Sequence, residues 1–259
     1  MTQTLNELFN LKGKVAIVTG GGKGIGKGIT LRLAEAGATV IIAEHDVVAA
    51  EETLKEINNN GKVIKTDVSK FSDINNAVKQ TLDQYGKIDI LINNAGIFPM
   101  SPFLDVSEEL WDKVIDTNLK GSVLFAQAVA KEMKKQGNGG KIVNISSIDS
   151  LHPSGNLVHY DASKGGLSMA TKSIALELAP YKINVNAIAP GAIKTPGASM
   201  VGKTPEEQEA IMKPFTDKIP WKRMGLPDDI ATLTLFLSTS AADYITGQLF
   251  VVDGGYLLA

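Results

Sequence analysis

The sequence predicts an α/β fold: one doubly wound domain in which a parallel sheet of about seven strands carries helices on both faces. Short apolar runs rich in β-branched residues alternate with helix-like segments along the whole chain. No linker, repeat, low-complexity tract or shift in composition interrupts the 259 residues. We therefore expect residues 1–259 to form a single domain.

The composition limits the classes of function. The chain is 44% apolar and 21% charged, as in ordinary globular proteins. Because it has no cysteine, disulfides, thiolate catalysis and cysteine-ligated zinc are excluded. The net charge of −2 gives no argument for nucleic acid or an anionic membrane as a partner. The sequence shows no signal peptide and no membrane-length apolar run, so we expect a cytoplasmic protein.

The first half of the chain carries four predicted strands. They are 14–19, 39–43, 62–66 and 88–92. Three helix-like segments follow the first three strands, at 25–36, at 46 to about 59 and at 72–85. Gly37 is a suitable C-terminal cap for the first helix, and Asp46 is a suitable N-terminal cap for the second.

The second half keeps the same alternation. Its predicted strands are 141–145, 183–188 and 249–252. Ser107 caps a helix that starts at Glu108, and further helices are predicted at 118–135 and 160–178. Strand–helix alternation of this kind is typical of a parallel sheet.

Residues 195–221 break this alternation. The segment 204–207 reads Thr-Pro-Glu-Glu, a capping box with proline in the first turn, and it would start a helix carrying Ile211, Met212 and Phe215. Because the insert follows the sixth strand, it lies at the carboxyl edge of the sheet, where ligands bind in open α/β folds. We interpret the insert as a substrate lid. The alternative is a surface loop without a role in substrate binding.

A glycine-rich loop, GGGKGIG at 20–26, joins the first strand to the first helix. Its glycines permit a tight turn and allow the backbone to approach a pyrophosphate at the helix N-terminus. Glu44 stands eighteen residues after Gly26, at the tip of the second strand. There a carboxylate can bind the adenine ribose hydroxyls and repel a 2′-phosphate. The alternative is that Glu44 is a solvated loop acid.

Tyr160 and Lys164 are four residues apart, so in a helix they share one face. An ammonium close to a phenol lowers the tyrosine pKa, and such a tyrosine can pass a proton to or from an alcohol oxygen. Ser147, thirteen residues before Tyr160, can hydrogen-bond to the same oxygen. A surface tyrosine stacked on a lysine stem is the alternative if the pair is taken alone.

Taken together, the motifs resemble those of the classical short-chain dehydrogenase/reductase family, over essentially the whole chain. The motifs are TGGGKGIG at 19–26, NNAG at 93–96, Asn118 in TNLKG, Ser147 in NISS, YDASK at 160–164 and PGAIKT at 190–195. Six motifs in the family's order are far more specific than any one of them. The resemblance implies a Rossmann-type fold, a homotetramer and an NAD(P)-dependent enzyme acting on CH–OH groups.

The resemblance also implies a catalytic tetrad of Asn118, Ser147, Tyr160 and Lys164. Lys164 would additionally hold the nicotinamide ribose, and Asn118 would support Lys164 through water in a proton relay. Ser147 is chosen over Ser146 because the family's serine stands thirteen residues before the tyrosine.

Cofactor contacts are implied along the carboxyl ends of the strands, with Asp67 and Val68 near adenine and Asn94 near the adenine ribose. Ile193 and Thr195 would lie near the nicotinamide carboxamide. The full set of implied cofactor-binding residues is Gly20, Lys23, Gly24, Ile25, Gly26, Glu44, Asp67, Val68, Asn94, Gly96, Tyr160, Lys164, Pro190, Gly191, Ile193 and Thr195.

Two residues point to different cofactors. Glu44 resembles the acid of NAD-preferring family members, whereas Lys23 resembles a basic residue of NADP-preferring ones. An acid close to a 2′-phosphate is repulsive whatever Lys23 does, so we predict NAD as the cofactor and NADP as the less favoured one.

The segment between Ser147 and Tyr160 departs from the family pattern, because Asp149 stands where small residues are common. Asp149 could anchor a hydroxyl or a cation of the substrate, or bond local backbone amides. His152 and His159 could line the same pocket, and with His45 distant in sequence we expect no metal site.

The predicted activity is that of an NAD(H)-dependent alcohol dehydrogenase or carbonyl reductase on a small-molecule substrate. A 3-oxoacyl thioester reductase, a sugar or polyol dehydrogenase and a hydroxysteroid dehydrogenase remain alternatives. A non-catalytic dinucleotide-binding sensor is the alternative from another class, and the intact tetrad speaks against it.

Overall fold

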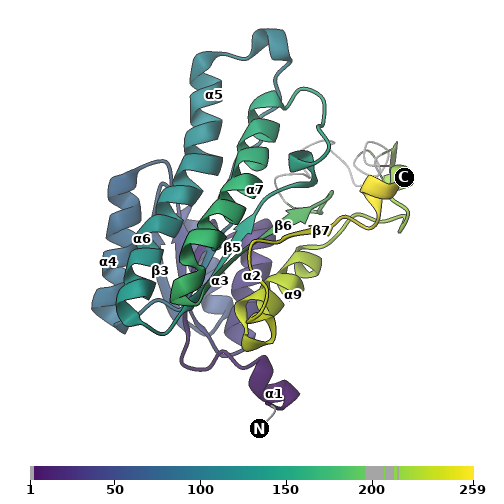
Figure 1. Cartoon of the computed structure of the whole chain (residues 1–259). Coiled ribbons are helices and arrows are strands. Elements are labelled where there is room, and N and C mark those ends of the chain that lie inside the picture. Colours follow the sequence, from purple (N-terminus) through teal and green to yellow (C-terminus); the bar gives the residue numbers. More distant parts are fainter. Residues whose placement is uncertain (1–2, 196–206, 208–212, 215) are drawn as a thin grey trace.

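The computed structural model describes residues 3–195, 207, 213–214 and 216–259. In this part of the chain seven parallel strands form one sheet between layers of helices (Figure 1). The strand order is β3-β2-β1-β4-β5-β6-β7, so the order reverses between β1 and β4. The predicted α/β class with a doubly wound parallel sheet is confirmed.

All seven predicted strands are present, and their ends differ from the prediction by no more than two residues. They are β1 (Val15–Thr19), β2 (Thr39–Glu44), β3 (Gly61–Lys65), β4 (Ile90–Asn93), β5 (Gly140–Ile145), β6 (Ile183–Pro190) and β7 (Leu249–Val252). Each neighbouring pair is parallel, so the carboxyl ends of all strands lie along one edge of the sheet.

The helices cover both faces of this sheet. They are α1 (Leu5–Leu8), α2 (Gly24–Glu35), α3 (Val47–Glu56), α4 (Phe71–Tyr85), α5 (Glu108–Ile115), α6 (Gly121–Gln136), α7 (Val158–Leu178) and α9 (Pro227–Ser238). Two predicted N-terminal caps are confirmed: Asp46 accepts a hydrogen bond from Ala49 N, and Ser107 accepts one from Leu110 N. α9, which packs against α2, was not predicted from the sequence.

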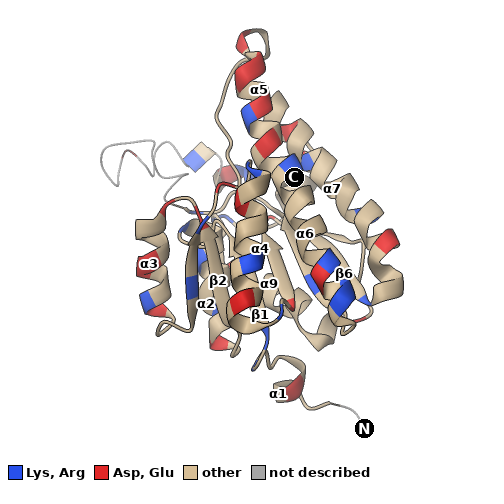
Figure 2. Cartoon of the chain, turned by 90° about the vertical axis from the view of Figure 1, so that its left-hand side faces the viewer, with Lys and Arg blue, Asp and Glu red and all other residues tan. Residues whose placement is uncertain are grey.

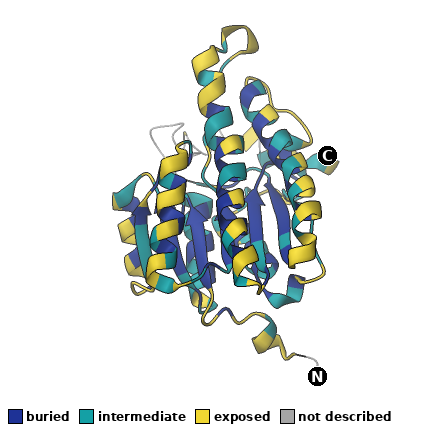
Figure 3. Cartoon of the chain, turned by 60° about the vertical axis from the view of Figure 1, so that its left-hand side comes forward, coloured by how far each residue is buried: buried dark blue, intermediate teal, exposed yellow. Residues whose placement is uncertain are grey.

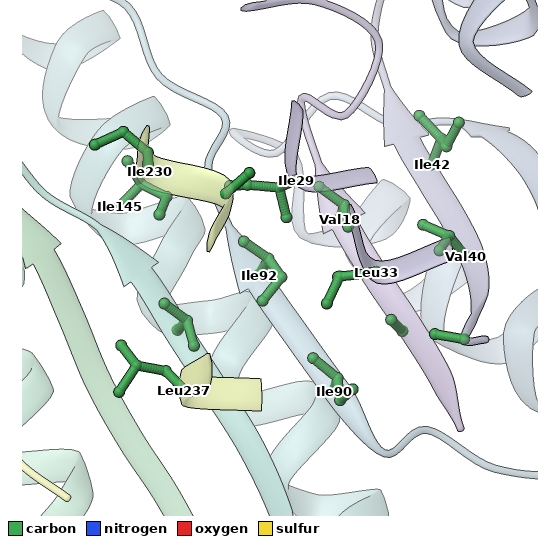
Figure 4. Close-up of a cluster of buried hydrophobic side chains, with 14 of the residues drawn as sticks. Val18, Ile29, Leu33, Val40, Ile42, Ile90, Ile92, Ile145, Ile230 and Leu237 are labelled. Atoms are coloured by element: carbon green, nitrogen blue, oxygen red, sulfur yellow. The ribbon is translucent and has the colours of Figure 1, made fainter. Parts of the chain in front are cut away.

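Two apolar clusters hold the layers together. The strands are buried whereas the outward faces of the helices are exposed (Figure 3). Alternate strand residues face opposite clusters, so Ile17 packs toward α4, α6 and α7, and Val18 toward α2, α3 and α9. Figure 4 shows part of the cluster that contains Val18, with Ile29 and Leu33 of α2 beside the strands. Burial on both faces is what a parallel sheet requires, and it fixes the strand ends that carry the site.

The helix predicted at 118–135 begins earlier than expected. α5 and α6 are joined by a π-helical turn, Asp116–Lys120, so one helical segment runs from Glu108 to Gln136. A π turn inserts one extra residue into the helix and is frequent at functional sites. Here it contains Asn118, which is fully buried.

Most of the predicted lid, 195–221, lies outside the described residues, including the capping-box residues 204–206 and the residues Ile211, Met212 and Phe215. Among the residues that the structure describes, no helix is long and apolar enough to span a membrane. Acidic and basic residues are mixed along α3, α4 and α6 (Figure 2).

Candidate active site

A cleft of about 780 Å³ runs along the carboxyl ends of the strands, from the glycine loop to the start of α7. It gathers residues from the ends of six strands, β1 to β6, and from α2, α5, the π turn and α7. The predicted site residues that line it are Gly20, Lys23, Gly24, Ile25, Gly26, Glu44, Asp67, Val68, Asn94, Gly96, Ser147, Tyr160, Lys164, Pro190, Gly191 and Thr195. Among the predicted residues, Asn118 and Ile193 do not line it.

The glycine loop fits a dinucleotide pyrophosphate. Gly24, the first residue of α2, has φ +52°, which suits glycine. A Cβ atom at Gly26 would lie 2.0 Å from the carbonyl oxygen of Gly20, so no side chain is tolerated there. The loop therefore remains a bare backbone surface at the N-terminus of a twelve-residue helix, where N–H groups and the helix dipole favour phosphate.

Glu44 ends β2 and is held by backbone amides. Its Oε1 accepts hydrogen bonds from His45 N (2.8 Å) and Asp46 N (3.1 Å), and its Oε2 accepts one from Gly22 N (3.2 Å). Each carboxylate oxygen can accept about two hydrogen bonds, so Oε2 has room for one more, such as a ribose hydroxyl. The carboxylate thus faces the cleft in a fixed position.

Lys23 forms an ion pair that sequence reasoning missed. Its Nζ lies 2.5 Å from Asp46 Oδ2, and this hydrogen bond raises the pKa of Lys23 and lowers that of Asp46. Both side chains are largely exposed. The signal that could have found the pair is an acid two residues after Glu44, at the cap of α3.

Asn94 and Asp67 shape the adenosine end of the cleft. Asn94 Nδ2 donates to the carbonyl oxygens of Thr19 and Gly20, both at 3.0 Å, and so ties β4 to the glycine loop. A hydrogen bond from the Ser69 hydroxyl, at 2.6 Å, is the main cause of a lowered pKa of Asp67. Asp67 is therefore ionised at neutral pH.

Asn118 sits behind the cleft rather than in its wall. Its Oδ1 accepts from Ile97 N, and its Nδ2 donates to Ile97 O, both at 2.8 Å. A Cβ atom on Gly96 would lie 3.3 Å from Asn118 Oδ1 and 3.6 Å from Lys164 Nζ. The absence of a side chain at position 96 leaves room for both polar groups beside its backbone.

Lys164 is buried in α7, and its Nζ donates to the carbonyl oxygen of Ile145 at 2.7 Å. Burial lowers its pKa to about 8. The ammonium lies 5.7 Å from the ring centroid of Tyr160. Lys164 and Tyr160 thus share one helix face, as predicted.

The prediction that Lys164 lowers the pKa of Tyr160 is wrong for this structure. Burial raises the pKa of Tyr160 to about 12, against a smaller lowering by the hydrogen bond with Ser147. Asp149 and Asp161 raise it further by their charge. The Lys164 ammonium is not among the groups that shift this pKa. Tyr160 is accordingly protonated and can act as an acid.

Ser147 and Ser146 differ in their partners. The Ser146 hydroxyl is bound to the Lys164 carbonyl (3.1 Å) and to Ser168 Oγ (2.8 Å), which fixes α7 to β5. The Ser147 hydroxyl instead hydrogen-bonds with Tyr160 and donates to Asp149 Oδ2 at 2.7 Å. This geometry favours Ser147 as the serine next to the reacting oxygen.

Three other predicted residues lie elsewhere. His159 is fully buried with Nε2 2.7 Å from the Pro99 carbonyl oxygen, and His152 is exposed; neither lines the cleft. The Ile193 side chain packs against Gly225.

Within the described part of the chain, no cluster of three or more histidine and acidic side chains could hold a metal ion.

Comparison with known proteins identifies a family and several relatives. A family model described as "Enoyl-(Acyl carrier protein) reductase" matches residues 20–257. The 2-dehydro-3-deoxy-D-gluconate 5-dehydrogenase of Dickeya dadantii is 38% identical over 252 residues, which cover 96% of this chain and 97% of the relative. Galactitol 2-dehydrogenase of Agrobacterium fabrum is 38% identical over 255 residues, covering 95% and 98%.

Solved structures agree over the same length. A short-chain type dehydrogenase/reductase from Mycobacterium marinum superposes with a TM-score of 0.91 at 36% identity, covering 99% of this chain and 100% of that chain. A 7α-hydroxysteroid dehydrogenase in complex with NADH and 7-oxo glycochenodeoxycholic acid gives a TM-score of 0.91 at 34% identity, with 98% of each chain covered.

Proposed function

Since the chain belongs to the short-chain dehydrogenase/reductase family, we propose that it is an NAD(H)-dependent dehydrogenase of secondary alcohols and reductase of ketones, with Tyr160 as its general acid and base. It is an oxidoreductase that transfers a hydride between a nicotinamide cofactor and a CH–OH or carbonyl carbon. The observation that carries the proposal is the meeting of Ser147, Tyr160 and Lys164 at one end of a cleft whose other end is the glycine loop.

The residues present fit a dinucleotide in this cleft. The bare glycine loop suits the pyrophosphate, and the amide-held carboxylate of Glu44 suits the adenine ribose. Lys164 would hold the nicotinamide ribose, while Pro190, Gly191 and Thr195 would surround the nicotinamide. When bound, the nicotinamide supplies or accepts the hydride.

In the direction of reduction, the protein's part is to hold the carbonyl oxygen and protonate it. The Tyr160 hydroxyl donates its proton to that oxygen, and the Ser147 hydroxyl turns from Asp149 to donate a hydrogen bond to it. Lys164 moves a proton toward Tyr160 afterwards, and Asn118 connects Lys164 to water. In oxidation the same groups act in reverse, so Tyr160 must first lose its proton.

The proposed preference for NAD rests on two acids. Glu44 faces the position of the adenine ribose, and Asp46 already pairs with Lys23, the one basic residue that we weighed in favour of a 2′-phosphate. Lys23 would have to leave Asp46 before it could bind the phosphate. The acidic pair therefore supports NAD.

We also propose a homotetramer in the cytoplasm. Met169 and Leu176 on α7 are 61% and 77% exposed, which is unusual for apolar residues of a long helix. Such an apolar face could pack across a two-fold axis, as the family resemblance implies.

The experiment is a nicotinamide absorbance assay with ketones, sugars, polyols, 3-oxoacyl thioesters and hydroxysteroids, each with both cofactors. Turnover of at least one CH–OH or ketone substrate, faster with NAD(H), is the expected result. Dinucleotide binding without any turnover would instead favour the non-catalytic sensor.

A further inference from the structure

Asp149 places a negative charge next to the reacting centre. Its Oδ2 accepts the Ser147 hydroxyl at 2.7 Å, and its backbone N donates to Ser147 Oγ at 3.1 Å. If Ser147 contacts the reacting oxygen at an ordinary hydrogen-bond length, the carboxylate lies within about 5–6 Å of that oxygen. A substituent on the neighbouring substrate carbon that is directed toward Ser147 would come about as close.

The carboxylate also retains hydrogen-bonding capacity. The hydroxyls of Ser147 and Ser154 occupy one position on each of its oxygens. A carboxylate offers about four such positions, so about two are open to donors from a ligand. Asp149 is only partly buried, but it is not among the residues that line the cleft, so a ligand would meet it at the edge of the cleft beside Ser147.

The charged groups around Tyr160 do not cancel this charge. Asp161 adds a second carboxyl on α7, and Asp149 is near enough to help raise its pKa, which stands at about 6 mainly because of burial. Lys164 is bound to the Ile145 carbonyl, 5.7 Å from the Tyr160 ring. His159, on the other flank, has one ring nitrogen on the Pro99 carbonyl. The two charged groups that raise the pKa of Tyr160 are both acids.

We propose that Asp149 determines substrate class: through its carboxylate beside Ser147, the site takes neutral polyhydroxy alcohols and ketones and rejects substrates with an anionic group next to the reacting carbon. A hydroxyl on the carbon beside the reacting carbon donates a hydrogen bond to an open position on Asp149. A carboxylate at the same place is repelled by the charge of Asp149, because the space between them is partly desolvated. The inference rests on the proposed function. Among the candidate substrate classes, which are 3-oxoacyl thioesters, sugars or polyols and hydroxysteroids, it selects a sugar or polyol.

The test compares ketones that differ in charge, and comparing their ratio between variants removes the difference in their intrinsic reactivity. Methyl 3-oxobutanoate and 3-oxobutanoate share the reacting carbonyl, and only the second is an anion; L-erythrulose is the neutral polyhydroxy probe. We expect wild-type kcat/KM with NADH to favour the methyl ester over the anion by about tenfold to a hundredfold. Asp149→Asn should lower that ratio at least tenfold, whereas Asp105→Asn, which removes an exposed charge, should not change it.

The ratio cancels any general loss that comes from moving Ser147, so a purely structural effect would leave it unchanged. Asp149→Asn should also lower the apparent pKa of alcohol oxidation, because a charge that opposes the Tyr160 phenolate is gone. An anion used as well as its ester, or an unchanged ratio in Asp149→Asn, overturns the proposal.

If none of these three probes is turned over with either cofactor, the charge assignment is tested by binding, while the wider substrate screen decides the proposed function separately. Fluorescence of bound NADH, titrated with the same three probes, measures their relative affinities directly. Equal affinity for ester and anion overturns the assignment; tighter binding of the ester that Asp149→Asn abolishes supports it.

Discussion

Substituting Glu44→Ala should weaken the preference for NAD, and the structure allows the size of the effect to be worked out. A 2′-phosphate on the adenine ribose would stand close to the Glu44 carboxylate, which three backbone amides hold in place. At an effective dielectric near 20, two unit charges about 4 Å apart repel by roughly 4 kcal/mol. Solvent and the nearby Lys23 reduce this, so we expect wild type to prefer NAD by about 1.5–3 kcal/mol, about ten- to a hundred-fold.

The assay is kcat/KM with NAD and with NADP for wild type, Glu44→Ala, Lys23→Ala and the double variant. Glu44→Ala should improve NADP and weaken NAD, because the repulsion and the ribose hydrogen bond are both lost. Lys23→Ala in that background should harm NADP more than NAD, since Lys23 is then the remaining phosphate ligand. The reasoning is refuted if wild type already prefers NADP.

Three further predictions concern the rest of the site and the assembly. Lys164→Ala should reduce both turnover and nucleotide affinity, measured by kinetics and by calorimetry; an effect on turnover alone would remove it from the ribose. The rate of alcohol oxidation should rise with pH from about 7 to about 10, because a raised pKa keeps Tyr160 protonated at neutral pH; a flat profile would contradict the need for its phenolate. Light scattering at micromolar concentration should give a tetramer, and a monomer would refute the assignment of the α7 face.

The fold was predictable because its strands are apolar and short. β1, β2 and β4 are buried on both faces, so each reads as an uninterrupted apolar run ending in polar or glycine residues. α9 was missed, although Pro227 at its first position is a typical helix start. The π turn around Asn118 depends on tertiary packing, and the spacing of apolar residues along the sequence does not predict such a turn.

The sequence predicted which residues meet in the site better than it predicted their pKa values and ion pairs. Spacing placed Tyr160 and Lys164 on one helix face, but the partner of Lys164, the Ile145 carbonyl, comes from a strand nineteen residues earlier. Only the folded chain shows that this carbonyl binds the ammonium and that burial is the largest influence on the pKa of Tyr160. The ion pair of Lys23 with Asp46 likewise needs the approach of two elements 23 residues apart.

The most direct test of the central claim, that Tyr160 is the acid and base of a hydride-transfer site, is the turnover of Tyr160→Phe. The variant keeps the ring and its edge contact with Phe98 but loses the transferable proton. We predict a loss of kcat of about 10²–10⁴-fold with nearly unchanged nucleotide affinity, whereas Tyr244→Phe, at a fully exposed tyrosine, should behave as wild type. Turnover of Tyr160→Phe within a few-fold of wild type would contradict the account.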